Sequence, residues 1–304
     1  MSDSVARAIH IAILLALTLE RSGAQAPVST GTALLRIETS VVLIPVSVTD
    51  TNGRFVAGLH FDDFELRDNG QLQHISSLVT EEGPISLCIV FDVSKSMTKP
   101  MPHAREAVRK LLAHSSPDDE FSLVVFRDKP SVALRWTTDA KAILEITDSV
   151  EPAGSTALYD ALILALNEFR RAGHGRRAIV VISDGAENGS RYTFGEVVNI
   201  VRETDVAIYP IHLPDGSSEA YDTEAALTIV ATESGGRYMR ARKAKDFATI
   251  ADSLEVRQFY VLAYRPRKTR WDGKYRKVSV KLLSAVRERP TRLSWRHGYF
   301  TPAR

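Results

Sequence analysis

The stretch "SLCIVFDVSKSMTKP" (residues 86–100) joins an apolar run to three oxygen-bearing side chains. The apolar run ends at Asp92, and Ser94 and Ser96 follow it at alternate positions. Open α/β sheets bind ligands outside the carboxyl ends of their strands, so the end of a buried strand is a favourable place for such groups. The stretch therefore indicates a ligand site in addition to a turn.

Two further oxygen-bearing residues occur at comparable places. Thr156 lies in "PAGSTALYD", at the start of a predicted helix, and Asp184 ends the strand-like "AIVVISDG", where Gly185 lets the chain turn away. We expect the two groups to converge with Asp92, Ser94 and Ser96 at one edge of a sheet.

The chemistry of these five groups indicates a hard cation, because they offer oxygens and neither imidazole nor thiol. Mg²⁺ or Mn²⁺ suits five ligands, whereas Ca²⁺ takes more and suits them less well. Only two of the groups are carboxylates, so the ion would stay under-neutralised and would seek one more anionic oxygen. We expect that oxygen to come from a Glu or Asp carboxylate of a partner protein.

The elements that must position these groups alternate between strand and helix. Strands are predicted at 85–92, 121–126, 132–136, 177–183, 206–213 and 236–240, and helical spacing of apolar residues fills the gaps, as at Ala104, Ala107, Val108 and Leu111. Such alternation, with nearly all-apolar strands, predicts an α/β fold with a doubly wound, mostly parallel, six-stranded sheet. Residues 132–136 follow their neighbour after a short turn, which predicts an antiparallel edge strand.

The segments on both sides of this region have the period of β-strands. Val42, Ile44, Val46 and Val48 share one face, and "FELRDNGQLQHISSLV" places two short strands around the turn Asn69-Gly70. After the helix-like "DFATIADSLEVRQ", the stretches "FYVLAYRP", "YRKVSVKLL" and "RLSWRHGYF" predict three strands. Neither flank is large enough for its own core. We therefore expect a signal peptide at 1–24, an N-terminal β segment at 25–82, an inserted α/β domain at 83–257, and a C-terminal β segment at 258–304 that completes a β-sandwich with 25–82.

The five residues on this strand-helix frame resemble the von Willebrand factor type A domain and its metal-ion-dependent adhesion site. The family's D-x-S-x-S, later threonine and later aspartate have their counterparts in "DVSKS", "GSTALYD" and "ISDG". The flanking β segments are similar to those of bacterial proteins related to this family. The resemblance implies that Asp92, Ser94, Ser96, Thr156 and Asp184 ligate a metal that binds a partner without catalysis. It also suggests that Thr156, which comes from a separate loop, is the ligand most able to move.

Other classes of function match the sequence less well. "SMTK" (Ser96 to Lys99) has the S-x-x-K spacing of serine acyl-enzymes, but the companion motifs of that class are not intact. Asp92 stands where an aspartyl nucleophile of a phosphatase would, but Ser94 replaces the expected second carboxylate. A structural module with an unused metal site is the third alternative, in which the same residues act as helix caps and turns.

The composition and the N-terminal residues indicate where the protein acts and which partners it lacks the charge to bind. The formal net charge of +2 gives no reason to expect a nucleic-acid partner. Arg7, the apolar run "IAILLALTL" and the small residues after it predict a secretory signal peptide that ends at Ala24, which would make the protein secreted or envelope-associated. Cleavage after Ala26 and an uncleaved N-terminal anchor are the alternatives. No other apolar run is long enough to span a membrane, so we expect no transmembrane span in the mature chain. The single cysteine, Cys88, lies in an apolar run, where we expect it to be buried and inert.

Overall fold

The computed structural model describes residues 41–51, 53–113, 115–213, 220–241, 246, 258–267, 272–283 and 290–303. The predicted signal peptide at 1–24 lies outside these residues, and so does the helix expected over 246–258, apart from its two ends. Within the described part, no helix is both long enough and apolar enough to cross a membrane.

The central sheet has six strands in the order β10-β9-β8-β5-β6-β7. Their bounds are β5 (Ile85–Asp92), β6 (Glu120–Phe126), β7 (Ser131–Thr137), β8 (Arg176–Ser183), β9 (Ala207–His212) and β10 (Met239–Arg240). All neighbours are parallel except β7, which pairs antiparallel with β6 at the edge of the sheet. The predicted fold class and the predicted antiparallel edge strand are both confirmed.

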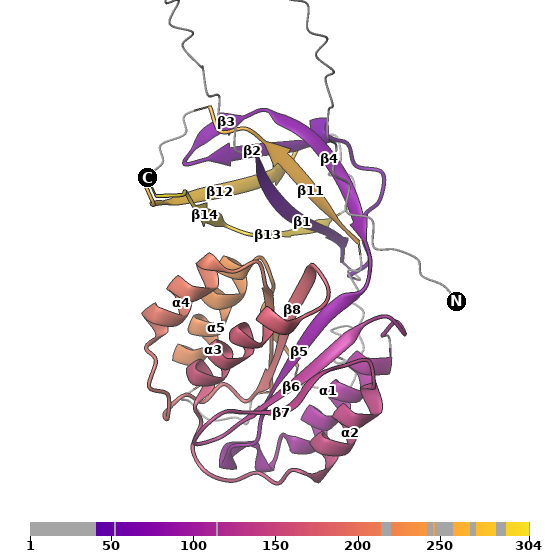
Figure 1. The fold of residues 1–304 in the computed structure, drawn as a ribbon, viewed down its shortest axis with the longest axis vertical. Helices are drawn as coiled ribbons and strands as arrows, with labels where there is room; N and C mark the ends of the chain where they lie inside the picture. The colour runs from indigo at the N-terminus through magenta and orange to yellow at the C-terminus, as the bar shows by residue number, and fades with distance from the viewer. Residues whose placement is uncertain are drawn as a thin grey trace, which may run out of the picture. The chain divides into compact units, whose positions relative to one another are not determined.

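Helices cover both faces of this sheet (Figure 1), with α1 and α2 on one face and α3, α4 and α5 on the other. Their bounds are α1 (Met101–Ala113), α2 (Ala140–Ser149), α3 (Leu158–Glu168), α4 (Phe194–Glu203) and α5 (Ala220–Ser234), with short 3-10 helices η1 (Phe61–Asp63), η2 (Lys95–Thr98) and η3 (Phe169–Arg171).

Strand β5 contributes side chains to the cores on both faces of the sheet. Side chains alternate along a strand, so Ile89 and Phe91 pack into the core on the α1 side, while Cys88 and Val90 pack into the core on the α3 side. All four are fully buried, and Cys88 is a free thiol. Because both faces are covered, the strand has no polar face, which is why residues 87–91 are an unbroken apolar run.

The flanking segments form two four-stranded antiparallel sheets, each of which contains strands from both ends of the chain. One sheet has the order β13-β1-β11-β4 and the other β14-β12-β2-β3. The bounds are β1 (Val42–Asp50), β2 (Phe64–Asp68), β3 (Gln71–Gln73), β4 (Ile75–Glu82), β11 (Gln258–Tyr264), β12 (Tyr275–Leu282), β13 (Thr291–Trp295) and β14 (Gly298–Phe300). Their shared core includes Val46 from one flank and Tyr264 from the other, which explains why neither flank could bury its apolar face alone.

The last predicted strand differs from expectation. "RLSWRHGYF" was expected to form one strand, but the structure divides it into β13, which pairs with β1, and β14, which pairs with β12 in the other sheet. Gly298 begins β14 so close to its neighbour that an added Cβ would lie 2.3 Å from the carbonyl oxygen of Arg276. The chain changes sheets at this point because the two flanks share strands, and a period of two within one stretch cannot reveal such a change.

Candidate functional site at the carboxyl edge of the central sheet

Asp92 and Asp184 lie at the ends of two adjacent parallel strands. Asp92 is the last residue of β5, and Asp184 directly follows β8, which pairs with β5 as far as Phe91 and Ile182. Both residues are buried, with 0% and 4% of their surface exposed. The fold therefore places two carboxylates close together at the carboxyl edge of the sheet, as the sequence predicted.

The carboxylate of Asp92 has neutral hydrogen-bond donors. Its Oδ1 accepts from the backbone N–H of Ser94 at 2.8 Å, and its Oδ2 accepts from the hydroxyl of Ser183 at 2.6 Å. Burial, followed by the negative charge of Asp184, raises the pKa of Asp92 to about 7, although the hydrogen bonds from Ser183 and Ser94 oppose this rise. The side chain is thus held in one orientation while its negative charge stays uncompensated, which is the condition in which a cation binds well.

Ser94 and Ser96 follow in the short 3-10 helix η2. Ser94 is the N-cap of this helix and is fully buried, whereas Ser96 is exposed. Their hydroxyl oxygens lie 3.1 Å apart. The tight turn brings alternate residues to the same side after β5, so the two hydroxyls form a pair that extends from the buried Asp92 toward solvent.

Asp184 begins a sharp turn. Its Oδ1 accepts from the backbone N–H of Ala186 at 3.2 Å, and Gly185 has a φ of +88°. A Cβ at Gly185 would lie 3.1 Å from Nε2 of the buried His212. A larger residue at position 185 would therefore meet both an unfavourable backbone conformation and the His212 ring.

Thr156 lies in the loop before α3 and is 2% exposed. Its backbone N–H donates to Oδ1 of Asn188 at 2.9 Å, and its carbonyl oxygen accepts from the backbone N–H groups of Asn188 and Gly189. This loop also contacts the turn after β5, because Lys95 N–H donates to the carbonyl oxygen of Gly154 at 3.1 Å. The loops that carry Thr156, Asp184 and the two serines are thus joined to one another.

The donor set fits a small hard cation. It comprises two carboxylates and three hydroxyls, and these are the oxygen ligands that Mg²⁺ accepts while it keeps some water. In the part of the chain that the structure describes, no three His, Cys, Asp or Glu side chains gather in a way that could hold a metal. Asp92, Ser94, Ser96, Thr156 and Asp184 would hold the ion, which would supply a Lewis-acidic position for one more anionic oxygen.

The geometry gives little support to an acyl-enzyme at Ser96. The hydroxyl of Ser96 is hydrogen-bonded to that of Ser94, and Lys99 is exposed at the C-cap of η2. A nucleophilic serine needs a base within hydrogen-bond reach. No hydrogen bond between Ser96 and Lys99 is present in the described part of the chain.

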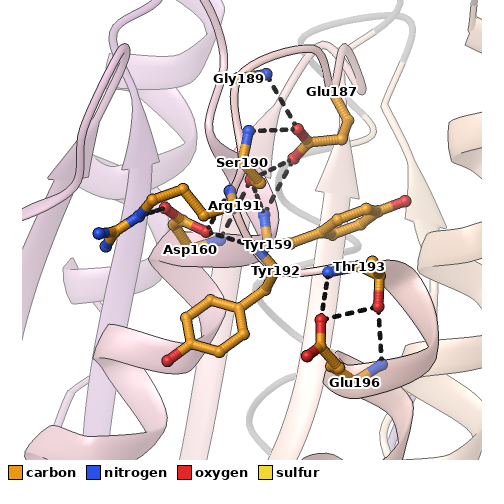
Figure 2. A network of polar contacts seen from close by, with 9 residues as sticks. All are labelled: Tyr159, Asp160, Glu187, Gly189, Ser190, Arg191, Tyr192, Thr193 and Glu196. Carbon is orange, nitrogen blue, oxygen red and sulfur yellow. Dashed lines mark hydrogen bonds and ion pairs between the residues drawn. The ribbon is translucent and has the colours of Figure 1, made fainter.

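Several residues at this edge were not identified from the sequence. Ser183 donates to Asp92, and Figure 2 shows Glu187 and Ser190 in contact with the start of α3. Asn188 holds Thr156. The segment "SDGAENGS" contains all four, but its polar composition is that of an ordinary loop, and only the fold shows which strand or helix each residue reaches.

Parts of this chain are similar to known proteins. Residues 87–187 match the family model of the von Willebrand factor type A domain, a range that includes all five candidate ligands. The chain is 26% identical over 151 residues to an uncharacterized protein of Borreliella burgdorferi, covering 46% of this chain and 43% of that protein. It is also 26% identical over 200 residues to inter-alpha-trypsin inhibitor heavy chain H4 of Homo sapiens, covering 61% of this chain and 21% of that protein. The chain therefore spans less than half the length of either relative.

A solved structure extends the likeness beyond the matched residues. The structure of a von Willebrand factor type A protein from Catenulispora acidiphila resembles this chain with a TM-score of 0.50 and 11% identity, over 88% of this chain and 75% of that one. At this identity the likeness concerns the fold alone. The family match and the order of the strands in the central sheet show that this chain contains a von Willebrand factor type A domain.

Proposed function

We propose that this chain is an exported binding module that captures a carboxylate of a partner protein through a divalent cation. Asp92, Ser94, Ser96, Thr156 and Asp184 hold the ion, which is Mg²⁺ or Mn²⁺, and the partner's Glu or Asp completes its coordination. The role is binding and not catalysis. One observation carries the proposal, namely the buried and mutually repelling pair Asp92 and Asp184 beside two hydroxyls at the carboxyl edge of the sheet.

This pair supports a cation because Asp92 is buried beside a second negative charge, and a buried charge is costly unless a counter-charge is present. The direct donors to Asp92 are a hydroxyl and a backbone N–H, both neutral. If Asp92 had a purely structural role, a neutral or protonated side chain at position 92 would be enough. A cation beside the two carboxylates would offset their repulsion.

The charges around the site support an anionic partner. Lys95, Lys99, Arg127 and Lys129 are all exposed in the loops after β5 and β6, and none forms an ion pair with another described residue. Asp128, the carboxylate among them, accepts hydrogen bonds from Ser155. Positive charges at the rim of a binding surface speed the approach of an acidic partner and discriminate against basic ones.

Export is the second part of the proposal and rests on the N-terminal pattern alone. Arg7, the following apolar run and the small residues up to Ala24 have the order of a secretory signal. A module that binds protein partners through a divalent cation is well suited to the outside of a cell, where cations and partners are both available. N-terminal sequencing of the protein from its host should find a chain that begins near Gln25.

Panning a random peptide library on the purified protein tests capture of a carboxylate. In Mg²⁺, we expect wild-type protein to select peptides that EDTA elutes and that contain Glu or Asp. These peptides should lose binding when that residue becomes Gln or Asn. Asp92→Ala should select none while its circular dichroism stays that of the wild type.

Asp139→Ala, which removes an exposed carboxylate at the N-terminus of α2, is the matched control and should behave as wild type. Binders that are indifferent to EDTA and carry no acidic residue would contradict the proposal.

A further inference from the structure

The N-terminus of α3 has no cap of its own. The first backbone N–H groups of a helix have no partner within the helix, and the side chain of the N-cap residue usually accepts from one of them. In α3 the N-cap is Ala157, whose side chain cannot accept a hydrogen bond. The helix nevertheless begins at a buried place, with Leu158 two residues after Thr156, so its N–H groups need acceptors from elsewhere.

The acceptors come from the loop after Asp184 (Figure 2). Tyr159 N–H donates to Oε2 of Glu187 and to Oγ of Ser190, both at 3.0 Å, and Asp160 N–H donates to Oγ of Ser190 at 3.2 Å. Glu187 also accepts from the hydroxyl of Ser190 at 2.8 Å, and its other oxygen accepts from Ser190 N–H at 2.9 Å. We call residues 187–190 the cap segment, because they cap a helix that begins about thirty positions earlier in the chain.

The same segment holds the backbone of Thr156 from both sides. Thr156 N–H donates to Oδ1 of Asn188 at 2.9 Å, and the Thr156 carbonyl oxygen accepts from Asn188 N–H at 3.0 Å and from Gly189 N–H at 2.9 Å. A Cβ at Gly189 would lie 3.1 Å from Oγ of Ser155 and 3.3 Å from the Thr156 oxygen. The glycine thus permits an approach that a larger side chain would obstruct.

The far side of the Thr156 loop is held as well. Ser155 donates to Oδ1 of Asp128 through both its N–H and its hydroxyl, each at 2.9 Å. Gly154 has a φ of +79°, and a Cβ there would lie 2.3 Å from Oδ2 of Asp128. Lys95 N–H donates to the Gly154 oxygen. The loop that carries Thr156 is therefore fixed on three sides, by the loops after β5, β6 and β8.

We propose that Glu187, Asn188 and Ser190 are positioning residues that preset Thr156 relative to Asp184, so that the cation meets a site already formed. This inference rests on the proposed function of the same site. One loop after β8 supplies a ligand, Asp184, and three residues later begins the segment that fixes another ligand. Movement of Thr156, which the family resemblance suggests, would have to break the hydrogen bonds of the cap segment.

Mn²⁺ titration calorimetry on three full-length proteins tests this role. Loss of a group that orients a metal ligand typically weakens metal affinity by about 10-fold to 100-fold, and we expect a loss of this size for Glu187→Ala. The matched control is Glu196→Ala. Glu196 is likewise a helix-capping carboxylate in Figure 2, but it serves α4 together with Thr193 and contacts no residue of the Thr156 loop. It should bind Mn²⁺ as tightly as wild type, and equal affinities in all three proteins would overturn the inference.

A double-mutant cycle separates positioning from a general structural effect. If Glu187 acts through Thr156, then Thr156→Ala and Glu187→Ala together should weaken Mn²⁺ binding no more than the more harmful single change does. Additive losses would show that Glu187 affects the metal by another route and would overturn the role assigned to it.

Hydrogen exchange without metal keeps this inference separate from the proposed function. In metal-free wild type the amides of Thr156, Tyr159 and Asp160 should exchange slowly, and Glu187→Ala should expose them while Glu196→Ala should not. Protection that appears only after Mn²⁺ is added would overturn preformation, even though the metal binds. Wild-type protein that shows slow exchange but binds no Mn²⁺ would contradict the proposed function and also the positioning role.

Discussion

Two buried aspartates at the same edge of the sheet are in opposite electrostatic situations. Asp92 is fully buried with a hydroxyl and a backbone N–H as its donors, and burial together with Asp184 raises its pKa to about 7. Asp160 is 6% exposed, and burial also tends to raise its pKa. Hydrogen bonds from Tyr192 N–H and Arg191 N–H, and an ion pair with the Arg191 guanidinium, outweigh burial and lower it. The fold therefore favours the ionised form of Asp160 and disfavours that of Asp92.

The difference separates an acid that the fold stabilises in its ionised form from the acid that we propose as a metal ligand. Burial alone does not distinguish them, because both side chains are inaccessible. The distinguishing property is whether the hydrogen bonds and nearby charges together outweigh burial, as they do for Asp160 and do not for Asp92. Asp160 uses its charge to hold the loop after β8 against α3, whereas Asp92 costs the metal-free protein stability. The predictions below test this contrast, from the largest expected effect to the smallest.

The charge on Asp92 should destabilise the metal-free protein as pH rises. Below its usual pKa of 3.8 the group is protonated in both the folded and the unfolded chain, so it has no effect. Between about pH 4 and about pH 7 only the folded chain keeps the proton, so the free energy of unfolding falls with rising pH. Since one pKa unit corresponds to about 1.4 kcal/mol, the cost above pH 7 is on the order of 4 kcal/mol.

Urea denaturation in EDTA, at pH values from 4.5 to 8, measures this cost against Asp92→Asn. The variant lacks the charge, so its advantage over wild type should grow through this range. A constant difference at all pH values would mean that Asp92 is already ionised at pH 4.5, and the contrast with Asp160 would disappear.

Asp160→Asn should have the opposite sign. The substitution removes the charge that the two backbone N–H groups and Arg191 stabilise, and a hydrogen bond to a charged group contributes about 1.5–3 kcal/mol. We expect a loss of about 2 kcal/mol in the free energy of unfolding. Because the pKa of Asp160 is lowered, its contribution is complete above its usual value of 3.8 and is lost only as pH falls through the lower folded value. The loss should therefore be the same at pH 6 and pH 8 by urea denaturation, and a stabilised variant would contradict the account.

Ser183→Ala sharpens the contrast, because Ser183 supplies the side-chain hydrogen bond to Oδ2 of Asp92 and also accepts from Gly185 N–H. Its removal should cost about 1–2 kcal/mol at pH 8, where Asp92 is ionised. The pKa of folded Asp92 should rise further, because the ionised form has lost a donor, so the fall in stability of the metal-free protein should extend to higher pH. Thermal denaturation in EDTA across the same pH range detects both changes. A melting temperature equal to that of wild type at every pH would show that Ser183 does not stabilise the carboxylate.

Arg191→Gln should have the smallest effect. The Arg191 side chain is 87% exposed, and its Nε lies 3.2 Å from Oδ2 of Asp160. Exposed ion pairs contribute about 0.2–1 kcal/mol, and the backbone N–H groups that hold Asp160 remain in the variant. We expect a loss of about 0.5 kcal/mol by urea denaturation. A loss as large as that of Asp160→Asn would show that the guanidinium, and not the backbone, neutralises the carboxylate.

The sequence predicts the scaffold well because local periodicity reports burial. The bounds of β5 follow from its apolar run, and the antiparallel β7 follows from the short turn before it. Pairing of the two flanks follows from their small separate cores. The division of residues 291–300 between two sheets could not be predicted, because both halves have the same period.

The surroundings of the site are less accessible to sequence reasoning. The cap of α4 is local, and the T-x-x-E spacing of Thr193 and Glu196 is a recognisable signature. The cap of α3 comes from Glu187 and Ser190, which no spacing rule connects to Tyr159. Likewise, Ser183 is one residue from Asp184 in sequence but donates to Asp92, on the neighbouring strand. Contacts between loops depend on the order of the strands, which a single sequence leaves open.

Titration of the metal-free protein with Mn²⁺ at pH 8, followed by calorimetry, tests the central claim most directly. At this pH, above the Asp92 pKa of about 7, the ionised form predominates and protons compete little with the ion. The account predicts that wild type and the control Asp139→Ala bind one Mn²⁺ per chain, and that Asp92→Asn, with its fold intact by circular dichroism, binds none at the same concentrations. Equal binding by wild type and Asp92→Asn, or no binding by any of the three, would contradict it.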